Sequence, residues 1–257
     1  MNGSGPGLFE AVIESWRLVI GNAAALARIA FVPFLLFLAL HRLGAAYEPE
    51  GIKAIMAWSL LFTALPAVPA VMLLMPWYRI LLTKRNPAMA ERPATWWSIV
   101  LMLRWAGLDM MFFAGMAPVM AMSLQVMSAG DDLAMRPDIL VFQLTMIVIG
   151  SYLFYGRMGL SLPAAAAESD HSYRQSWAMT RDNGWRIGFA IILCWLPIQF
   201  LVSSLHEPLA TEDPTLAIQY LDAALGALLR TVNELLVTAV YVQFYLARTA
   251  PPLEGEW

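Results

Sequence analysis

Charged residues are scarce in this chain of 257 residues: only 14% are Asp, Glu, Lys or Arg, whereas 60% are hydrophobic. A soluble domain usually carries about 25% charged residues, so the composition excludes an ordinary water-soluble surface. Several apolar runs are long enough to span a bilayer. The composition therefore predicts an all-α, polytopic membrane protein.

The chain also has only one cysteine and no net positive charge. The single cysteine, Cys194, lies in an apolar run, which excludes an intrachain disulfide and predicts a small buried side chain. The net charge of −3 gives no reason to expect a nucleic-acid partner. The N-terminus lacks the basic segment and compact apolar core of a cleaved signal, so we expect the first span to act as an uncleaved targeting signal.

Motifs for catalysis or cofactor binding are missing as well. His41, His171 and His206 are scattered, and none belongs to an HExxH motif or a cysteine–histidine cluster. Ser169 and Asp170 adjoin His171, but neighbours in sequence do not make a catalytic triad, and there is no G-x-S-x-G sequence. The sequence therefore predicts a non-enzymatic protein with no cofactor and no metal site.

Six apolar segments, separated by short polar loops, predict six transmembrane helices in one domain covering residues 1–257. The predicted spans are about 23–40, 54–77, 106–127, 139–162, 185–205 and 225–248. Apolar periodicity with charges on the opposite face predicts interfacial amphipathic helices at 8–20 and 172–182. We also expect an interfacial or inclined segment to begin at Thr95 and lead into the third span. The last helical pattern, 215–248, is longer than a bilayer requires, so its first part should extend beyond the outer interface.

The basic residues predict the orientation. With six spans and both termini in the cytoplasm, four basic residues lie outside: Arg42, Lys53, Arg136 and Arg230. The other twelve lie inside: Arg17, Arg28, Arg79, Lys84, Arg85, Arg92, Arg104, Arg157, Arg174, Arg181, Arg186 and Arg248. This excess on one side follows the positive-inside rule, because all the loops are short enough for their charges to count.

A polar stretch, residues 163–185, interrupts the apolar second half of the chain. Ser172 and Gln175 have the spacing of a capping box, which predicts a helix that begins after Ser172. Tyr173, Trp177 and Thr180 share one face of that helix, so we expect these aromatic rings to face acyl chains. Two arginines lie off this face and should face phosphates: Arg174 and Arg181.

The order of amphipathic helix, proline-containing span and second span occurs three times. Trp16, Trp97 and Trp177 each precede the proline of a span by 17 to 21 residues, and Asn22 and Asn183 follow their tryptophans by six. Three helix-pair repeats would explain this order. The spacings drift, however, so the general anchoring of span ends by aromatic and basic residues remains an alternative.

The polar stretch resembles the hallmark of a broad family of bacterial six-span inner-membrane proteins, which is similar to the membrane domain attached to some glycerophosphodiester phosphodiesterases. The resemblance rests on Pro163, Ser172, Trp177, Asn183 and Trp185, and on Trp16 with Asn22. It implies a multi-pass protein of the bacterial inner membrane. The chain has no room for the soluble phosphodiesterase barrel, so the resemblance does not imply that activity.

Two acidic residues are predicted at membrane depth. Asp109 follows Arg104 near the inner end of the third span, and Glu234 lies four residues after Arg230, the spacing of an ion pair within one helix. Intramembrane acids also occur in ion and proton pathways. Two functions therefore remain open: a module that binds membrane lipids or a membrane or cytoplasmic protein partner, and a small secondary transporter or channel that uses Asp109 and Glu234. A continuous polar path between the two acids would favour transport.

Three arginines end the even-numbered predicted spans, each one to three residues after a tyrosine: Arg79, Arg157 and Arg248. Packing of three helix pairs around a pseudo-threefold axis would place them at one depth, as a cytoplasmic basic rim that includes Arg174 and Arg181. We expect this rim to bind anionic lipid headgroups or an acidic partner, with the tyrosines in the headgroup belt. The alternative is that each arginine anchors only its own helix.

Overall fold

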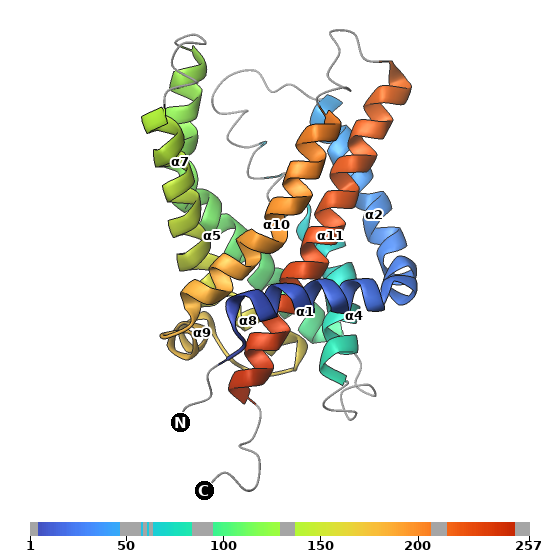
Figure 1. Ribbon diagram of the computed structural model, residues 1–257. Coiled ribbons are helices and arrows are strands. Elements are labelled where there is room, and N and C mark those ends of the chain that lie inside the picture. The colour runs from blue at the N-terminus through green and yellow to red at the C-terminus, as the bar shows by residue number, and fades with distance from the viewer. Residues whose placement is uncertain are drawn as a thin grey trace, which may run out of the picture.

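The computed structural model describes residues 5–46, 58, 61, 64–83, 95–128, 137–206 and 215–249. These parts of the chain are helical and contain no strands, which confirms the predicted all-α class for them. Helix α1 (Leu8–Gly21) lies across the long helices, and α2 (Ala23–Ala46) runs along them (Figure 1). The remaining elements are α4 (Ala67–Thr83), α5 (Thr95–Ser128), α7 (Pro137–Gly150), the π-helical segment η2 (Ser151–Gly156), α8 (Ser161–Ala166), α9 (Tyr173–Met179), α10 (Gly184–His206) and α11 (Leu216–Thr249).

Within the described residues, three helices are long and apolar enough to cross a membrane: α2, α10 and α11. The 34 residues of α11 agree with the long final helix that the sequence predicts. Helix α5 is continuous from Thr95 to Ser128, so the segment predicted to begin at Thr95 and the predicted third span belong to one helix. Of the predicted span 54–77, residues 54–57, 59–60 and 62–63 lie outside the described residues.

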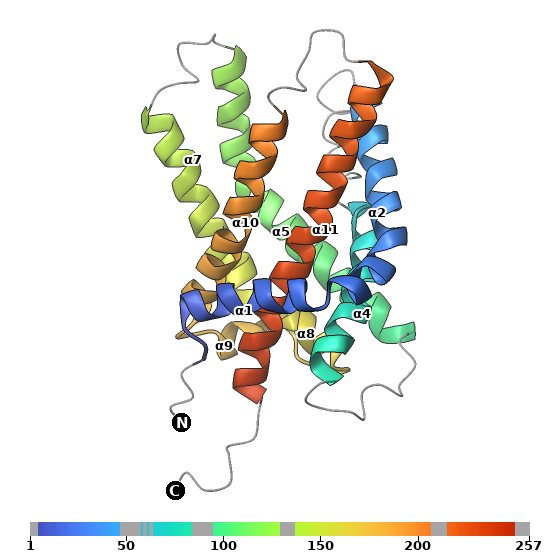
Figure 2. The same cartoon turned by 45° about the vertical axis from the view of Figure 1, so that its right-hand side comes forward.

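The long helices alternate in direction. Helices α2, α5 and α10 run one way and α4, α7 and α11 return, so that α8, α9 and the C-terminal end of α11 gather at one end (Figures 1 and 2). The buried core is built mainly from α4, α5, α8, α10 and α11. On α4, Trp77 is completely buried and donates a hydrogen bond from Nε1 to the Leu235 carbonyl of α11 at 2.9 Å. Trp77 thus combines a large buried apolar surface with a hydrogen bond, and the hydrogen bond fixes the position of α4 along α11.

Helix α1 packs on the bundle through small and large residues. Ala11 and Ser15 are fully buried, and Gln243 of α11 donates from Nε2 to the Ser15 hydroxyl at 2.9 Å and to the Ala11 carbonyl at 3.2 Å. Larger residues such as Val12 and Trp16 are partly buried and pack against the core. Phe9 and Ile13 face outward and are 69% and 59% exposed. The helix that the sequence predicts at 8–20 is therefore present; its place at the membrane interface stays a prediction.

Candidate functional site

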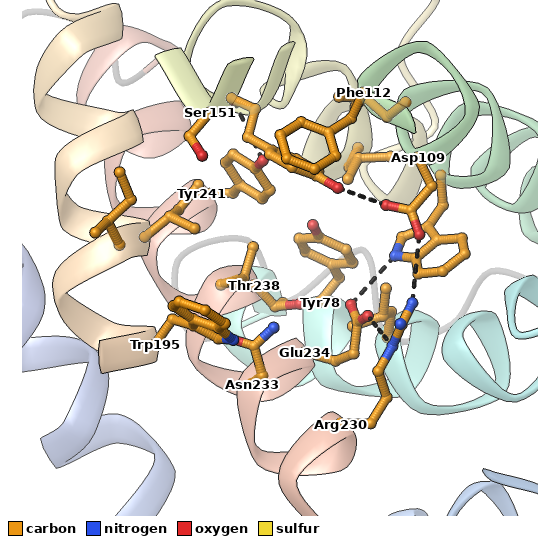
Figure 3. A pocket seen from close by; sticks show the side chains of 18 residues that line it. Tyr78, Asp109, Phe112, Ser151, Trp195, Arg230, Asn233, Glu234, Thr238 and Tyr241 are labelled. Atoms are coloured by element: carbon orange, nitrogen blue, oxygen red, sulfur yellow. Dashed lines mark hydrogen bonds and ion pairs between the residues drawn. The ribbon is translucent and has the colours of Figure 1, made fainter. Parts of the chain in front are cut away.

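The candidate site lies in the middle of α11, where Arg230 and Glu234 are one turn apart. Arg230 Nε is 3.1 Å from Glu234 Oε1, which confirms the predicted ion pair within the helix. Asp109 of α5 is the third member, because its Oδ2 lies 3.3 Å from Arg230 Nη2. One guanidinium thus joins two carboxylates from two helices, and we call these three residues the charge cluster (Figure 3).

This contact corrects one prediction. The sequence placed Asp109 near the inner end of its span and Arg230 on the outer side, but an ion pair requires the two residues to lie at one depth. The reason is that sequence spacing does not reveal how far one long helix is shifted along another. Arg104, which precedes Asp109 in the sequence, donates from Nη1 to the Ser161 carbonyl at 2.8 Å.

Every carboxylate oxygen of the charge cluster has a partner. Tyr155 donates its hydroxyl to Asp109 Oδ1 at 2.7 Å, and Trp105 donates Nε1 to Glu234 Oε2 at 3.1 Å. The Arg230 guanidinium also lies 5.2 Å from the centre of the Trp105 ring. Both acids are buried, at 8% and 7% exposure. Because a buried charge without partners is costly, this arrangement explains how two carboxylates remain inside an apolar bundle.

The charge cluster borders a cavity of about 520 Å³ between α4, α5, η2, α10 and α11. Its wall is mostly apolar and aromatic, and Figure 3 shows the charged groups Asp109, Arg230 and Glu234 together on one side of it. The charge cluster and several aromatic or amide side chains line the cavity, the latter being Tyr78, Trp105, Phe112, Tyr155, Trp195, Asn233 and Tyr241. The cavity is partly open to the surface of the molecule, and Trp195 in its wall is 37% exposed. A mostly apolar pocket with a few convergent polar groups is the usual form of a small-molecule site.

Two polar atoms in the cavity wall are poorly satisfied. Asn233 Oδ1 is buried without a hydrogen-bond partner. Tyr78 is fully buried, and its hydroxyl has Thr238 beside it, in a geometry that falls short of a hydrogen bond. Buried polar groups are nearly always paired. Both atoms belong to side chains that line the cavity, but neither atom is itself exposed to a water-sized probe.

The π-helical segment η2 forms part of the cavity wall. It presents Ser151 and Tyr155 to the cavity, and Tyr241 of α11 donates its hydroxyl to the Tyr155 carbonyl at 3.2 Å. Gly156 lies so close to Gly184 of α10 that a Cβ atom would collide with the Gly184 carbonyl. π-helical turns occur frequently at functional sites, and this one brings the Tyr155 phenol to Asp109.

The tyrosines that precede the three rim arginines do not lie where the sequence predicts. Tyr78 is fully buried, Tyr245 is 6% exposed, and Tyr155 binds Asp109 inside the bundle. The prediction that these residues form a headgroup belt is therefore wrong. A tyrosine near a span end followed by arginine fits an interfacial anchor, but a phenol can equally serve a buried carboxylate, and the sequence does not distinguish the two.

The capping box of the polar stretch is confirmed. The Gln175 N–H donates to the Ser172 hydroxyl at 3.4 Å, and the Ser172 N–H donates to Gln175 Oε1 at 2.6 Å. Tyr173 does not face outward as predicted, because its hydroxyl donates to the Arg104 carbonyl of α5. Trp177 and Trp185 remain 38% and 46% exposed.

The basic rim is only partly present. Arg157 is buried, donates from Nη1 to the Thr180 carbonyl at 2.7 Å and lies 4.5 Å from the centre of the Trp177 ring, so its assignment to a lipid-binding surface is wrong. Arg79 is ion-paired with Glu168 at 3.3 Å. Arg174 and Arg181 are exposed on and beside α9. The guanidinium of Arg157 serves instead to hold α9 against the rest of the chain.

Asn183 and Arg248 connect the polar stretch to the end of the chain. With its amide oxygen toward α11, Asn183 accepts from Arg248 Nη2 at 2.6 Å, and its amide nitrogen donates to the Asp182 carbonyl at 3.2 Å. The Ser169 hydroxyl contacts His171 Nδ1 in the loop before α9. Within the described parts of the chain, no three His, Cys, Asp or Glu side chains are grouped so that they could hold a metal ion.

Comparisons with known proteins identify no relative: no family model matches the chain, and no curated protein or solved structure shows significant similarity to it. The geometry of the charge cluster and its cavity is therefore the basis for assigning a function.

Proposed function

We propose that this protein is a small six-span membrane carrier that binds its substrate in the cavity beside Asp109, Arg230 and Glu234. The observation that carries the proposal is the joining of the two acids through Arg230 at the edge of a cavity of about 520 Å³. Transporter sites commonly lie where irregular helices meet within the membrane, and here the cavity adjoins the π-helical segment η2. Intramembrane charges that face a cavity are characteristic of such pathways.

The proposed topology has six spans, with both termini in the cytoplasm of a bacterial inner membrane. The alternating helix directions support it, as does the excess of basic residues in the segments assigned to the inner side. A threefold repeat receives mixed support. Asn22 and Asn183 both accept, through their carbonyls, from an N–H four residues later, at 2.9 and 3.2 Å, and so begin α2 and α10 alike. Helix α5, which has no break after its first turns, lacks this junction.

Access from both sides of the membrane tests the carrier proposal. The chain has one cysteine, so Cys194→Ala gives a background into which Asn233→Cys can be introduced at the cavity. A membrane-impermeant methanethiosulfonate should label this cysteine in right-side-out and in inverted vesicles, because a carrier exposes its site alternately. Ala178→Cys, on the exposed surface of α9, is the matched control and should react from one side only. Labelling of Asn233→Cys from a single side would contradict transport.

A lipid- or partner-binding module is the second candidate. The exposed Arg174 and Arg181 beside the exposed Trp177 favour it, since arginines and aromatic rings suit the headgroup layer. The double variant Arg174→Gln/Arg181→Gln should then lose anionic lipid, or an acidic protein partner, on purification from native membranes. Unchanged co-purification would leave these arginines as anchors of α9.

A further inference from the structure

The cavity contains one more negative group than positive groups. Among the described residues, its wall includes the carboxylates of Asp109 and Glu234 and one basic side chain, that of Arg230. The guanidinium uses both Nε and Nη2 on those carboxylates. An anionic ligand would therefore have to displace existing ion pairs, whereas a cation would supply the charge that the cavity lacks. A low local dielectric strengthens this preference.

Aromatic rings supply most of the remaining wall. Trp105 and Tyr155 bond to the two acids of the charge cluster. Phe112, Trp195, Tyr78 and Tyr241 also line the cavity, from α5, α10, α4 and α11 (Figure 3). The rings of Phe112 and Tyr155 are tilted against each other at 5.0 Å between their centres. Aromatic faces attract cations through their quadrupole, and this attraction is strongest when water is excluded.

Two separate features of the cavity wall, its net negative charge and its aromatic rings, therefore favour a positively charged guest. The cavity volume of about 520 Å³ is large enough for a drug-sized molecule.

We propose that the cavity binds an organic monocation, a substituted ammonium with an apolar body, whose charge lies near Asp109 and Glu234 and whose body lies against the aromatic wall. The proposal rests on the proposed function, because it names the substrate class of the same cavity. It requires no covalent step. Removing either carboxylate makes the cavity neutral, so we expect both acids to be necessary for the preference for a cation.

Binding is tested on the full chain in detergent micelles, by following thermal unfolding through tryptophan fluorescence. The probes share one aromatic ring and differ in charge: benzyltrimethylammonium, benzyl alcohol and phenylmethanesulfonate. A ligand that binds only the folded state raises the unfolding midpoint as its concentration rises. We expect such a rise with benzyltrimethylammonium alone. An equal response to all three probes, a larger response to the anion or no response to the cation would each overturn the proposal.

Variants locate the site. Asp109→Asn and Glu234→Gln should each raise the apparent Kd for benzyltrimethylammonium about tenfold or more, the range of a desolvated cation contact. Glu14→Gln, which removes the same charge from the surface of α1, should leave the Kd unchanged. Trp195→Leu changes the wall without touching the charge cluster and should also raise the Kd. An unchanged Kd in Trp195→Leu, or in an acid variant that folds, would refute the assignment of the cation site to this cavity.

The outcomes separate this inference from the carrier proposal. Labelling of Asn233→Cys from one side, combined with selective binding of the cation, would refute transport and leave a cation-binding site. Labelling from both sides, combined with a preference for the anion or for the neutral alcohol, would refute the cationic substrate and leave the carrier.

Discussion

At the scale of single residues, Arg230 organises the interior. Its bond to Glu234 could be predicted, because residues four apart on a helix are neighbours whatever surrounds them. Its bond to Asp109 could not, because that contact depends on the relative shift of α5 and α11. The hydrogen bonds from Tyr155 and Trp105 were missed for the same reason. The only available signal was general: acids within apolar spans require partners.

Loss of Arg230 should therefore cost more than loss of either acid. Arg230→Gln leaves two buried carboxylates without their cation, and we expect the free energy of unfolding to fall by about 3–5 kcal/mol. Glu234→Gln should cost about 1–2 kcal/mol, because Arg230 retains Asp109. Unfolding by dodecyl sulfate in mixed micelles measures both. Equal losses in the two variants would contradict a bridging role for Arg230.

Tyr173 should make stability depend on alkaline pH. Burial raises the pKa of Tyr173 from 10.0 to about 12, with nearby Arg104 opposing the change. Between these values the unfolded chain has lost the phenol proton and the folded chain retains it. The stabilisation is therefore complete below pH 10 and is lost as pH rises to about 12.

Tyr173→Phe isolates this effect. The variant loses the hydrogen bond to the Arg104 carbonyl, about 1 kcal/mol at neutral pH. Its stability difference from the wild type should shrink between pH 10 and pH 12, when measured by unfolding in mixed micelles. A difference that stays constant over this range would show that Tyr173 does not remain protonated in the folded chain.

At the scale of elements, the features that depend on neighbouring residues were predicted correctly, whereas the features that depend on how the helices pack were not. The capping box at Ser172 and the length of α11 follow from short-range spacing, and both are confirmed. The depth of Asp109 relative to Arg230 was predicted wrongly, because it depends on how α5 packs along α11. The π-helical form of η2 has no sequence signature here. It accompanies the close approach of η2 to α10 at Gly156, which becomes visible only when the helices are packed.

This close approach gives a sharp test of the element. In Gly156→Ala, the new methyl group would collide with the Gly184 carbonyl, and the backbone cannot yield cheaply. We expect η2 to shift, the unfolding midpoint to fall and Tyr155 to leave Asp109. Gly21→Ala is the matched control, since no atom lies within 4 Å of its added Cβ and alanine favours helices by up to about 1 kcal/mol. Equal stability of the two variants would contradict the packing of η2 on α10.

At the scale of the whole molecule, the basic residues and the path of the chain lead to the same topology. The end that gathers α8, α9 and the C-terminal end of α11 carries Arg174, Arg181 and Arg248 (Figures 1 and 2). Positive charges resist translocation, so this end is expected in the cytoplasm. Arg230 does not count in this comparison, because its guanidinium is paired inside the bundle and therefore does not act as a loop charge.

The topology can be tested at six positions. Alkaline phosphatase fused at Glu50, Asp132 or Glu212 should be active, because the chain is expected outside there; these three sites lie outside the described residues. Fusions at Pro87, Ser169 and Trp257 should be inactive, and a cytoplasmic reporter at the same positions should be active. Reversal of Asp132 alone would mean that α5 and α7 do not both cross the membrane, and reversal of Glu212 alone would mean the same for α10 and α11. Because Asp109 lies on α5 and Arg230 on α11, either result would contradict two membrane-spanning helices joined by this ion pair.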